Sequence, residues 1–332
     1  MTNVHGDPRE MFTRSARNPI LTAEAFPRMV NAAFNPGVVS FEGETLLLAR
    51  VEARTGLSSL VVATSANGVD GWRIDRDRGM EPELDSSSEH WGIEDPRITL
   101  VGDAYHIVYT GYGVGGPMVC LAVTRDFVTF ERRGVIHTPE DKDAALFPRM
   151  FDGRWALIHR PAPASAGLAA HMWISWSPDL HHWGDARIIM HARQGGWWDA
   201  NKIGLGPPPL ETDRGWLVCY HGVRVTASGS IYRLGLAMLD LEDPSQVIMR
   251  GDEWVFGPVA PYERAGDVGD VVFPCGWLVE DDRDTLQMYY GAADSTICLA
   301  TASVSDLIDH LESHPCSPPG PYQLVGKAVT EP

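Results

Sequence analysis

Short apolar runs recur along most of the chain, and turns rich in Gly, Pro, Asp and Asn separate each run from the next. Helical periodicity is hard to find before the segment VSDLIDHLESH near the end of the chain. Apolar runs of strand length between turn residues are typical of β-strands, whereas a helix needs a longer stretch with a period of about 3.6 residues. The pattern therefore predicts a mostly β protein.

The apolar runs form a fivefold repeat. One class reads TLLLARVE, YHIVYTGY, RWALIHRP, GWLVCYHG and TLQMYYGA, and after a turn each is followed by SSLVVATS, PMVCLAVT, HMWISWSP, YRLGLAML or STICLATA. A segment marked by proline precedes each unit: FNPGVV, EDPRIT, LFPRMF, GPPPLE and VFPCGW. Five units in register predict an all-β, five-bladed β-propeller with a central funnel. A pair of sandwiches or a two-domain α/β protein is the alternative, and the in-register repeat disfavours both.

The repeat leaves no room for a second domain. The segment GPPPL could pass for a linker, but it stands where the fourth unit begins. We expect a single propeller domain over residues 1–332, with a short N-terminal extension over about 1–17 and a C-terminal tail over about 313–332. The N-terminus lacks the apolar region of a secretory signal, and no run of about 18 apolar residues is present to span a membrane. These features predict a cytoplasmic protein without a membrane partner.

Composition narrows the choice of partners. The 44 Asp and Glu residues outnumber the 27 Lys and Arg residues, and the formal net charge of −17 leaves no surplus of cations for nucleic acid or an acidic membrane surface. Of the five cysteines, Cys120, Cys219 and Cys298 lie inside apolar runs, where free buried thiols are commoner than disulfides or metal ligands. A reducing compartment fits this pattern, and we expect no metal site.

Equivalent positions of successive propeller units converge around the mouth of one channel. Just past the apolar stretch of the first class of runs, the five units carry Arg50, Thr110, Arg160, His221 and Gly291. The proline-marked segments carry Asn35, Asp95 and Arg149, and Asp294 follows the strand of the fifth unit. Unpaired charges inside a core cost several kcal/mol. A ring this polar is therefore expected to line a funnel.

The stretch WGIEDPRITL places Asp95 in this ring. Because Pro96 restricts the residue before it, we expect an extended backbone at Asp95 that aims the carboxylate. Arg97 is expected to brace the turn rather than to touch a substrate, and Glu94 to point away from Asp95. A solvated surface turn in which Arg97 pairs with its acidic neighbours is the alternative.

Aromatic residues are abundant near these positions: Tyr109, Tyr112, Trp155, Trp197, Trp198, Tyr220, Tyr289 and Tyr290. Flat aromatic faces beside carboxylates and amides are what a sugar site needs, although each of these side chains taken singly is more often part of a core. Trp197 and Trp198 are candidates for a platform under an acceptor sugar, and core packing is the equal alternative.

Two kinds of chemistry fit the ring. Cleavage of a glycosidic bond normally needs one carboxylic acid to protonate the leaving oxygen, and a second carboxylate as nucleophile or as a base for water. Asp95 is the candidate acid, and the weaker motif GAAD offers Asp294 as the second carboxylate.

A basic set suggests a second route. It consists of Lys142, Arg149, His159, Arg160 and His221. Gathered in one funnel, these residues would bind an oxyanion such as phosphate, which is already anionic and can attack a sugar carbon itself, so that one carboxylic acid suffices. Pairing of the cations with the many acidic residues of the chain is the alternative.

Many separate motifs occur in a characteristic order. They are GIEDPRIT, KDAALFPR, GRWALIHRP, WISWSPDLHHWG, NKIGLGPPPLETDRGWLVCYHGV, YRLGLAMLDLEDPSQVI, ERAGDVGDVVFPCG and YYGAADSTICLATA. Together they resemble glycoside hydrolase family 130, the β-mannoside phosphorylases with some β-mannosidases. The similarity runs from about Asn18 to about Leu311, which is nearly the whole chain.

The resemblance implies a five-bladed propeller without metal or cofactor and an inverting reaction. In that reaction inorganic phosphate, the co-substrate, cleaves a β-mannosyl oligosaccharide to α-mannose 1-phosphate and a shortened sugar. The acid is the aspartate of the EDPR motif, here Asp95, and its proton passes through a mannose hydroxyl.

Residue by residue, the resemblance implies two binding sites. The mannosyl pocket falls on Asn35, Arg50 and Asp294. The phosphate site falls on Lys142, Arg160 and His221, with Arg149 and Tyr232 nearby. The run HRP departs from relatives that have another residue before the arginine, so the role of His159 stays open.

Other functions are weighed against this one. A β-mannosidase on the same fold would use water and a second carboxylate, but hydrolytic members tend to lack the basic phosphate set that this chain retains. A propeller lectin would bind mannosides without turnover and would need no phosphate site. The acceptor sugar (mannose, glucose or N-acetylglucosamine) depends on loops, and a homo-oligomer is an option for which the segment DLIDHL is the one candidate apolar contact.

Overall fold

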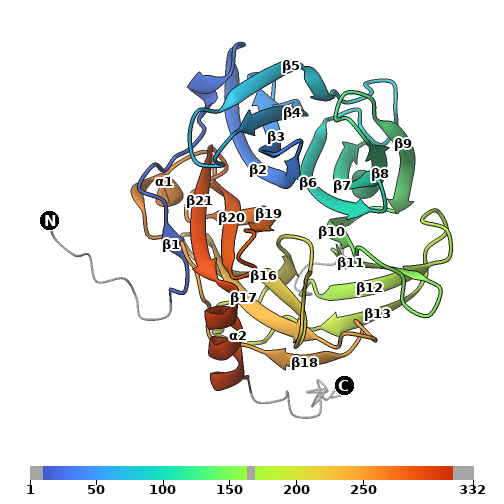
Figure 1. Cartoon of the computed structure of the whole chain (residues 1–332), viewed down its shortest axis with the longest axis vertical. Helices are drawn as coiled ribbons and strands as arrows, with labels where there is room; N and C mark the ends of the chain where they lie inside the picture. Colours follow the sequence, from blue (N-terminus) through green and yellow to red (C-terminus); the bar gives the residue numbers. More distant parts are fainter. Residues whose placement is uncertain (1–9, 163–168, 317–332) are drawn as a thin grey trace, which may run out of the picture.

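Five antiparallel sheets are arranged around one axis (Figure 1). The computed structural model describes residues 10–162 and 169–316. The first sheet contains β2 (Val30–Phe41), β3 (Glu44–Ala53), β4 (Ser58–Ser65) and β5 (Arg73–Met80), and the second contains β6 (Ile93–Val101), β7 (Ala104–Gly113), β8 (Gly116–Thr124) and β9 (Glu131–His137). The third contains β10 (Asp141–Leu146), β11 (Trp155–Pro161), β12 (Met172–Ser177) and β13 (Gly184–Met190).

The remaining elements complete the ring. The fourth sheet contains β14 (Lys202–Leu205), β15 (Leu210–Thr212), β16 (Gly215–Thr226), β17 (Gly229–Leu239) and β18 (Val247–Arg250). The fifth contains β19 (Val272–Val279), β20 (Thr285–Ala292), β21 (Thr296–Ser303) and the N-terminal β1 (Thr13–Arg14). The described helices are η1 (Ala23–Ala25), α1 (Pro261–Arg264) and α2 (Val304–Ser313). The predicted five-bladed propeller is confirmed.

Both faces of each sheet are covered by neighbouring sheets. In β3, Leu46 and Leu48 pack in a cluster with Ile107 of the second sheet, whereas Leu47 packs in a cluster with Tyr289 of the fifth. A strand that is buried on both faces has no polar side to present to water, so it reads as an unbroken apolar run. This explains why runs such as TLLLA do not alternate.

The innermost strands of the five sheets are β2, β6, β10, β14 and β19. β2 contacts β6 and β19, and β10 contacts β6 and β14. Their partners β3, β7, β11, β16 and β20 carry the predicted ring in register. Its members pair with residues of the inner strands: Arg50 with Phe34, Thr110 with Glu94, Arg160 with Lys142, His221 with Gly204 and Gly291 with Phe273. The equivalence of these five positions, predicted from the repeat, is confirmed.

Two of the proline-marked segments do not begin their units. β10 ends at Leu146 and β14 at Leu205, so LFPRMF and GPPPLE follow the inner strand instead of starting it. Proline cannot donate a ladder hydrogen bond and is favoured near the ends and irregularities of strands. A proline alone therefore does not tell the start of a strand from its end. The correction moves Arg149 out of register with Asn35 and Asp95.

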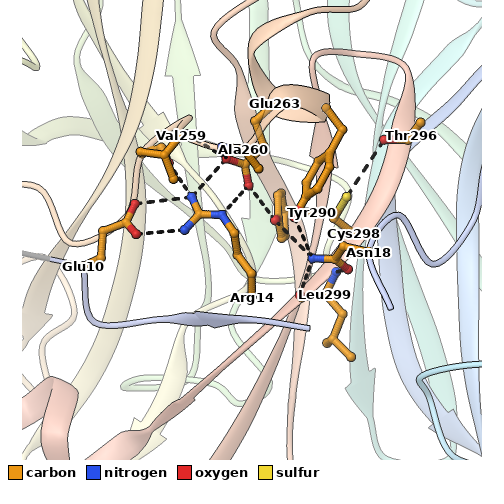
Figure 2. A network of polar contacts seen from close by, with 12 residues as sticks. Glu10, Arg14, Asn18, Val259, Ala260, Glu263, Tyr290, Thr296, Cys298 and Leu299 are labelled. Carbon is orange, nitrogen blue, oxygen red and sulfur yellow. Dashed lines mark hydrogen bonds and ion pairs between the residues drawn. The ribbon is translucent and has the colours of Figure 1, made fainter. Parts of the chain in front are cut away.

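The N-terminal strand closes the ring through the contacts in Figure 2. β1 pairs with β21, with Thr13 opposite Thr301. The Arg14 guanidinium donates to Glu263 at 2.7 Å and to Glu10 at 2.8 Å. Glu263 is fully buried and also accepts a hydrogen bond from the Tyr290 hydroxyl at 2.7 Å. Part of the expected N-terminal extension over about 1–17 thus belongs to the fifth sheet.

The C-terminal helix α2 packs against the same end of the ring. Leu307, Ile308 and Leu311 are buried in a cluster with side chains of the fourth and fifth sheets. The apolar stripe of DLIDHL is therefore used inside the chain and is not free for a second copy. Most of the expected tail, residues 317–332, lies outside the described part of the chain.

The cysteines match the expectation. Cys120, Cys219 and Cys298 are free and buried, as is Cys275. None of the described helices has the length and apolar character needed to cross a bilayer.

Candidate active site

Three inner strands carry a bulge at the same place. The register shifts between Phe34 and Gly37 in β2, between Glu94 and Arg97 in β6, and between Lys142 and Ala145 in β10. A bulge leaves one residue unpaired and redirects its side chain. Such features are conspicuous when they force a residue other than glycine into a positive φ.

The bulged residues are Asn35, Asp95 and Asp143, with φ of 45°, 50° and 53°. The expectation of an extended backbone at Asp95 is wrong, because the bulge rather than Pro96 sets its φ. The side chains of Asn35 and Asp95 meet between the first and second sheets, where the Asn35 amide donates to Asp95 Oδ1 at 2.9 Å. The strained backbone at these positions therefore orients polar side chains toward the axis.

Asp95 is only 4% exposed and sits against a guanidinium. Arg50 Nη1 donates to Asp95 Oδ1 at 3.1 Å, and Nη2 of the same side chain donates to Glu94 at 3.0 Å. The expectation that Glu94 points away from Asp95 is wrong, since both carboxylates bind Arg50. Burial tends to raise the pKa of Asp95, but Arg50 and Lys142 outweigh it, so the pKa lies below its ordinary value.

Arg97 braces the Asp95 turn, as expected. Its side chain is 1% exposed and donates to the Asp95 carbonyl at 3.0 Å, to the Gly206 carbonyl at 2.8 Å and to the Leu205 carbonyl at 2.9 Å. These bonds join the inner strand of the second sheet to the end of the inner strand of the fourth. The surface-turn alternative is therefore wrong.

Asp294 is close enough to Arg50 and Asp95 to interact electrostatically with both. Burial raises its pKa to about 6, the negative charge of Asp95 adds to this rise, and Arg50 and Lys142 oppose it. The two carboxyl groups therefore have pKa values pushed in opposite directions, which is a common feature of catalytic pairs. Gly291 leaves room for the Asn35 side chain, because a Cβ on it would lie 2.0 Å from the Asn35 side-chain oxygen.

The second half of the site is basic. Arg160 Nε donates to Asp143 Oδ2 at 2.6 Å, and His221 Nε2 lies 3.4 Å from the same oxygen. Lys142 Nζ lies 3.7 Å from Glu94, which links this half to Asp95. Burial lowers the pKa of His221 to about 4, so His221 is neutral near pH 7 and offers a hydrogen-bond donor rather than a charge. The Tyr232 ring centroid lies 5.8 Å from that of His221.

Lys202 also belongs to this half, and the sequence analysis did not include it. It comes from the start of β14, and its Nζ lies 5.1 Å above the ring of Tyr232. Burial and the positive charges of Arg160 and Lys142 lower its pKa to about 8. The signal that could have found it is its position in NKIGLG, two residues before Gly204, which pairs with His221.

Arg149 lies elsewhere. Its guanidinium donates to the Leu241 carbonyl at 2.7 Å, lies 3.3 Å from Glu211 and stacks 4.5 Å above the Phe151 ring. Arg149 follows β10 instead of lying within it, and its side chain contacts β15 and the turn after β17 in the fourth sheet. The structure does not bring Arg149 to the basic cluster.

His159 faces away from the funnel. Its Nδ1 lies 2.6 Å from Asp141 and its Nε2 lies 2.8 Å from the Ser175 hydroxyl. Within the described residues, His137, Asp141 and His159 form the one group with ligand atoms close enough for a metal ion. The His137 and His159 rings are stacked at 4.1 Å and 21°, so their in-plane lone pairs do not converge on one ion. The cluster lines a cavity of about 560 Å³, and His159 is the one member of the predicted basic set among the described lining residues.

Most of the aromatic candidates are core residues. Tyr109, Tyr220, Tyr289 and Tyr290 are at most 2% exposed, and Trp198 is buried against Tyr220. Trp197 is 41% exposed, and Arg193 stacks 3.9 Å above its ring. Of the two tryptophans proposed for an acceptor platform, only Trp197 therefore has an exposed face.

Comparison with known proteins identifies the family. The model of glycoside hydrolase family 130, described as β-1,4-mannooligosaccharide phosphorylase, matches residues 10–313. The chain is 33% identical to a β-1,4-mannooligosaccharide phosphorylase of Ruminococcus albus over 93% of both chains. The chain belongs to glycoside hydrolase family 130. It is also 38% identical to a β-1,2-mannobiose phosphorylase of Listeria innocua over 80% of this chain and 72% of that one.

The fold agrees with a solved family 130 structure. The β-1,2-mannobiose phosphorylase from Listeria innocua, in complex with β-1,2-mannobiose, superposes with a TM-score of 0.84 at 31% identity and covers 91% of this chain and 99% of that chain. The predicted enzyme class, a glycoside phosphorylase, is confirmed by these relatives.

In this family 130 protein, the raised pKa of Asp294 predicts a cost in stability. Its carboxyl has a pKa of about 6 in the folded chain against an ordinary value of 3.8, so the folded state favours the protonated form. The stabilisation is present below about pH 4 and is lost as the pH rises through about 6. The asparagine of Asp294→Asn is neutral at every pH, so the variant avoids the cost of ionising the buried carboxyl. We expect it to raise the free energy of unfolding by about 2–3 kcal/mol at pH 7.5, with little change near pH 4.

Urea unfolding at both pH values measures this difference. Asp281→Asn, at an exposed position after β19, serves as the control and should change neither value. Loss of stability in Asp294→Asn at pH 7.5 would mean that the carboxylate is held ionised by its cationic neighbours.

Proposed function

We propose that the chain catalyses inverting phosphorolysis of β-mannosides, in which phosphate and a β-mannosyl oligosaccharide give α-mannose 1-phosphate and a shortened sugar. The observation that carries the proposal is the division of the site into two connected halves. One half is built around the buried carboxylate of Asp95, and the other is a cluster of basic side chains. Lys142 and Glu94 link the two halves at 3.7 Å.

The first half suits a mannosyl unit. Asn35, Arg50 and Asp294 surround Asp95 and offer amide, guanidinium and carboxyl groups for sugar hydroxyls. Asp95 gives its proton to a mannose hydroxyl, which passes its own proton to the glycosidic oxygen as the bond to the leaving sugar breaks. Positioned general acid catalysis of this kind typically contributes about 10²–10⁴-fold.

The second half suits phosphate. Lys142, Lys202 and Arg160 offer positive charge, and His221 and Tyr232 offer further hydrogen-bonding groups. Phosphate held there attacks the sugar carbon on the face opposite the leaving oxygen, which inverts its configuration. The arriving negative charge offsets the cations that lower the pKa of Asp95, so the protonated form of the acid is favoured once phosphate is bound.

The reaction is proposed to take place within the one propeller domain, residues 1–332. The support is that both halves are built from neighbouring blades. The first comes from β2, β3, β6 and the turn after β20, and the second from β10, β11, β14, β16 and β17. A cytoplasmic setting is proposed as well, and free thiols at Cys120, Cys219 and Cys298 are compatible with it.

Cleavage of a β-mannoside is expected to require phosphate and to release mannose 1-phosphate. Product analysis of reactions with and without phosphate, with β-1,2- and β-1,4-mannobiose as substrates, measures this directly. Equal rates in phosphate-free buffer with free mannose as the product would establish a hydrolase instead. Binding of the disaccharide without turnover in either buffer would establish a lectin.

A further inference from the structure

Asp143 places a fixed negative charge inside the basic half of the site. Its carboxylate is 2% exposed and is held by Arg160 at 2.6 Å, by His221 at 3.4 Å and by Arg97 at 3.9 Å. Gly204 makes room for it, because a Cβ at that position would lie 2.4 Å from Asp143 Oδ2. The carboxylate is therefore built into the site by the β10 bulge and by a glycine on the facing strand.

The charged and titratable groups around Asp143 come from several strands. They are Arg97 on β6, Lys142 on β10, Arg160 on β11, Lys202 on β14, His221 on β16 and Tyr232 on β17. The cations keep the pKa of Asp143 well below its ordinary value despite burial, so this group is an anion throughout the neutral range. The hydrogen bonds of Arg160 to described side chains use its Nε, which leaves its two terminal nitrogens for a ligand.

A second anion can approach a buried carboxylate only if a proton lies between them, because like charges repel strongly in a desolvated site. Tetrahedral oxyanions differ in this respect. Phosphate and arsenate carry at least one hydroxyl proton near neutral pH, whereas sulfate carries none and presents acceptors alone. A site built to accept a hydrogen bond from a ligand hydroxyl rejects an analogue that lacks it, because the buried polar group is left unpaired.

We propose that Asp143 determines the specificity of the oxyanion site, accepting a hydrogen bond from the hydroxyl of phosphate and excluding sulfate. The inference rests on the proposed phosphorolysis and adds to it the chemical class of anion that the site accepts. Asp143 takes no proton from the ligand and breaks no bond. By holding the protonated oxygen, it leaves the unprotonated oxygens of phosphate to Arg160 and the lysines and to the sugar carbon.

Competition by sulfate tests the proposal in the wild-type enzyme. The rate of β-mannoside phosphorolysis is measured against phosphate concentration with increasing sodium sulfate, and sodium chloride keeps the ionic strength constant. We expect an inhibition constant for sulfate at least about 100-fold above the KM for phosphate. Arsenate in place of phosphate is expected to support cleavage. An inhibition constant for sulfate close to the KM for phosphate would overturn the proposal.

Asp143→Asn tests the residue itself. The asparagine can donate to an unprotonated oxygen, so the ratio of the sulfate inhibition constant to the phosphate KM is expected to fall to within about 10-fold. Asp141→Asn is the matched control on the same strand. The Asp141 side chain contacts His159 and the Arg160 backbone N–H but no side chain of the basic cluster, and asparagine keeps an oxygen for that N–H, so its ratio should equal that of the wild type. An unchanged ratio in a folded Asp143→Asn variant would overturn the assignment, and the wild-type competition decides the question if the variant does not fold.

The outcomes separate the two proposals. Cleavage that needs no phosphate contradicts the proposed phosphorolysis. Phosphate-dependent cleavage with strong inhibition by sulfate contradicts only the role of Asp143.

Discussion

Asp95→Asn is expected to lower the turnover of a β-mannoside by at least about 10²–10⁴-fold, the usual contribution of a positioned general acid. Asparagine is nearly isosteric and can still bind Asn35 and Arg50, so the fold and the binding of mannoside should persist. It has no proton of suitable acidity to pass to the leaving oxygen. Steady-state kinetics with a substrate that has a poor leaving group, together with calorimetric binding of the disaccharide, measures both effects.

Glu94→Gln is the matched control, since Glu94 binds the same guanidinium of Arg50 at 3.0 Å but is not the proposed acid. Glutamine keeps an oxygen for Arg50, and we expect a smaller loss of turnover than in Asp95→Asn. If Asp95→Asn retained most of the activity and Glu94→Gln abolished it, the acid would be Glu94.

Arg97→Met is expected to lower the free energy of unfolding by about 3–5 kcal/mol, which is the usual effect of removing one member of a buried polar network. The substitution leaves the carbonyl oxygens of Asp95, Leu205 and Gly206 without their donor. Equilibrium unfolding in urea gives the value. Arg125→Met is the control, because Arg125 pairs with Asp103 at the surface and such pairs contribute about 0–1 kcal/mol. Equal effects of the two substitutions would show that Arg97 has no special role in the fold.

The architecture could be predicted because the repeat records a physical constraint. In every blade the second strand is buried on both faces, and the chain turns before and after it. Apolar runs and turn residues therefore recur at equivalent positions of the five units. Arg50, Arg160 and His221 fall in register for the same reason, since each pairs with the inner strand of its own blade. Counting from the apolar run was therefore enough to find them.

The inner strands themselves were harder to read. A bulge adds one residue to a strand and is specified by long-range packing. Asn35 and Asp95 precede prolines whereas Asp143 precedes Ala144, so no local pattern marks Asp143 as their equivalent. When the repeat units are aligned on their prolines, Arg149 is wrongly placed in the ring and Lys202, at the start of β14, is missed.

The tyrosines were ambiguous for another reason. A tyrosine can fill a core and still satisfy its hydroxyl there, as Tyr109 does at 2.6 Å from Glu89 and Tyr290 does at 2.7 Å from Glu263. Abundance near strand ends therefore does not separate a sugar platform from blade packing.

The closure of the ring by β1 has a consequence for how the protein is made. β1 leaves the ribosome before the other described strands, yet its partner β21 includes Thr301, and the ion pair of Arg14 needs Glu263. The hairpins of the first four sheets pair neighbours in sequence and can form as they emerge, because local contacts cost little chain entropy. β1 can pair in the fifth sheet only after β21, the last described strand, has been made. Until β21 has been made, β1 has no strand to pair with. Its unpaired backbone stays exposed on the nascent chain during synthesis of the other described strands.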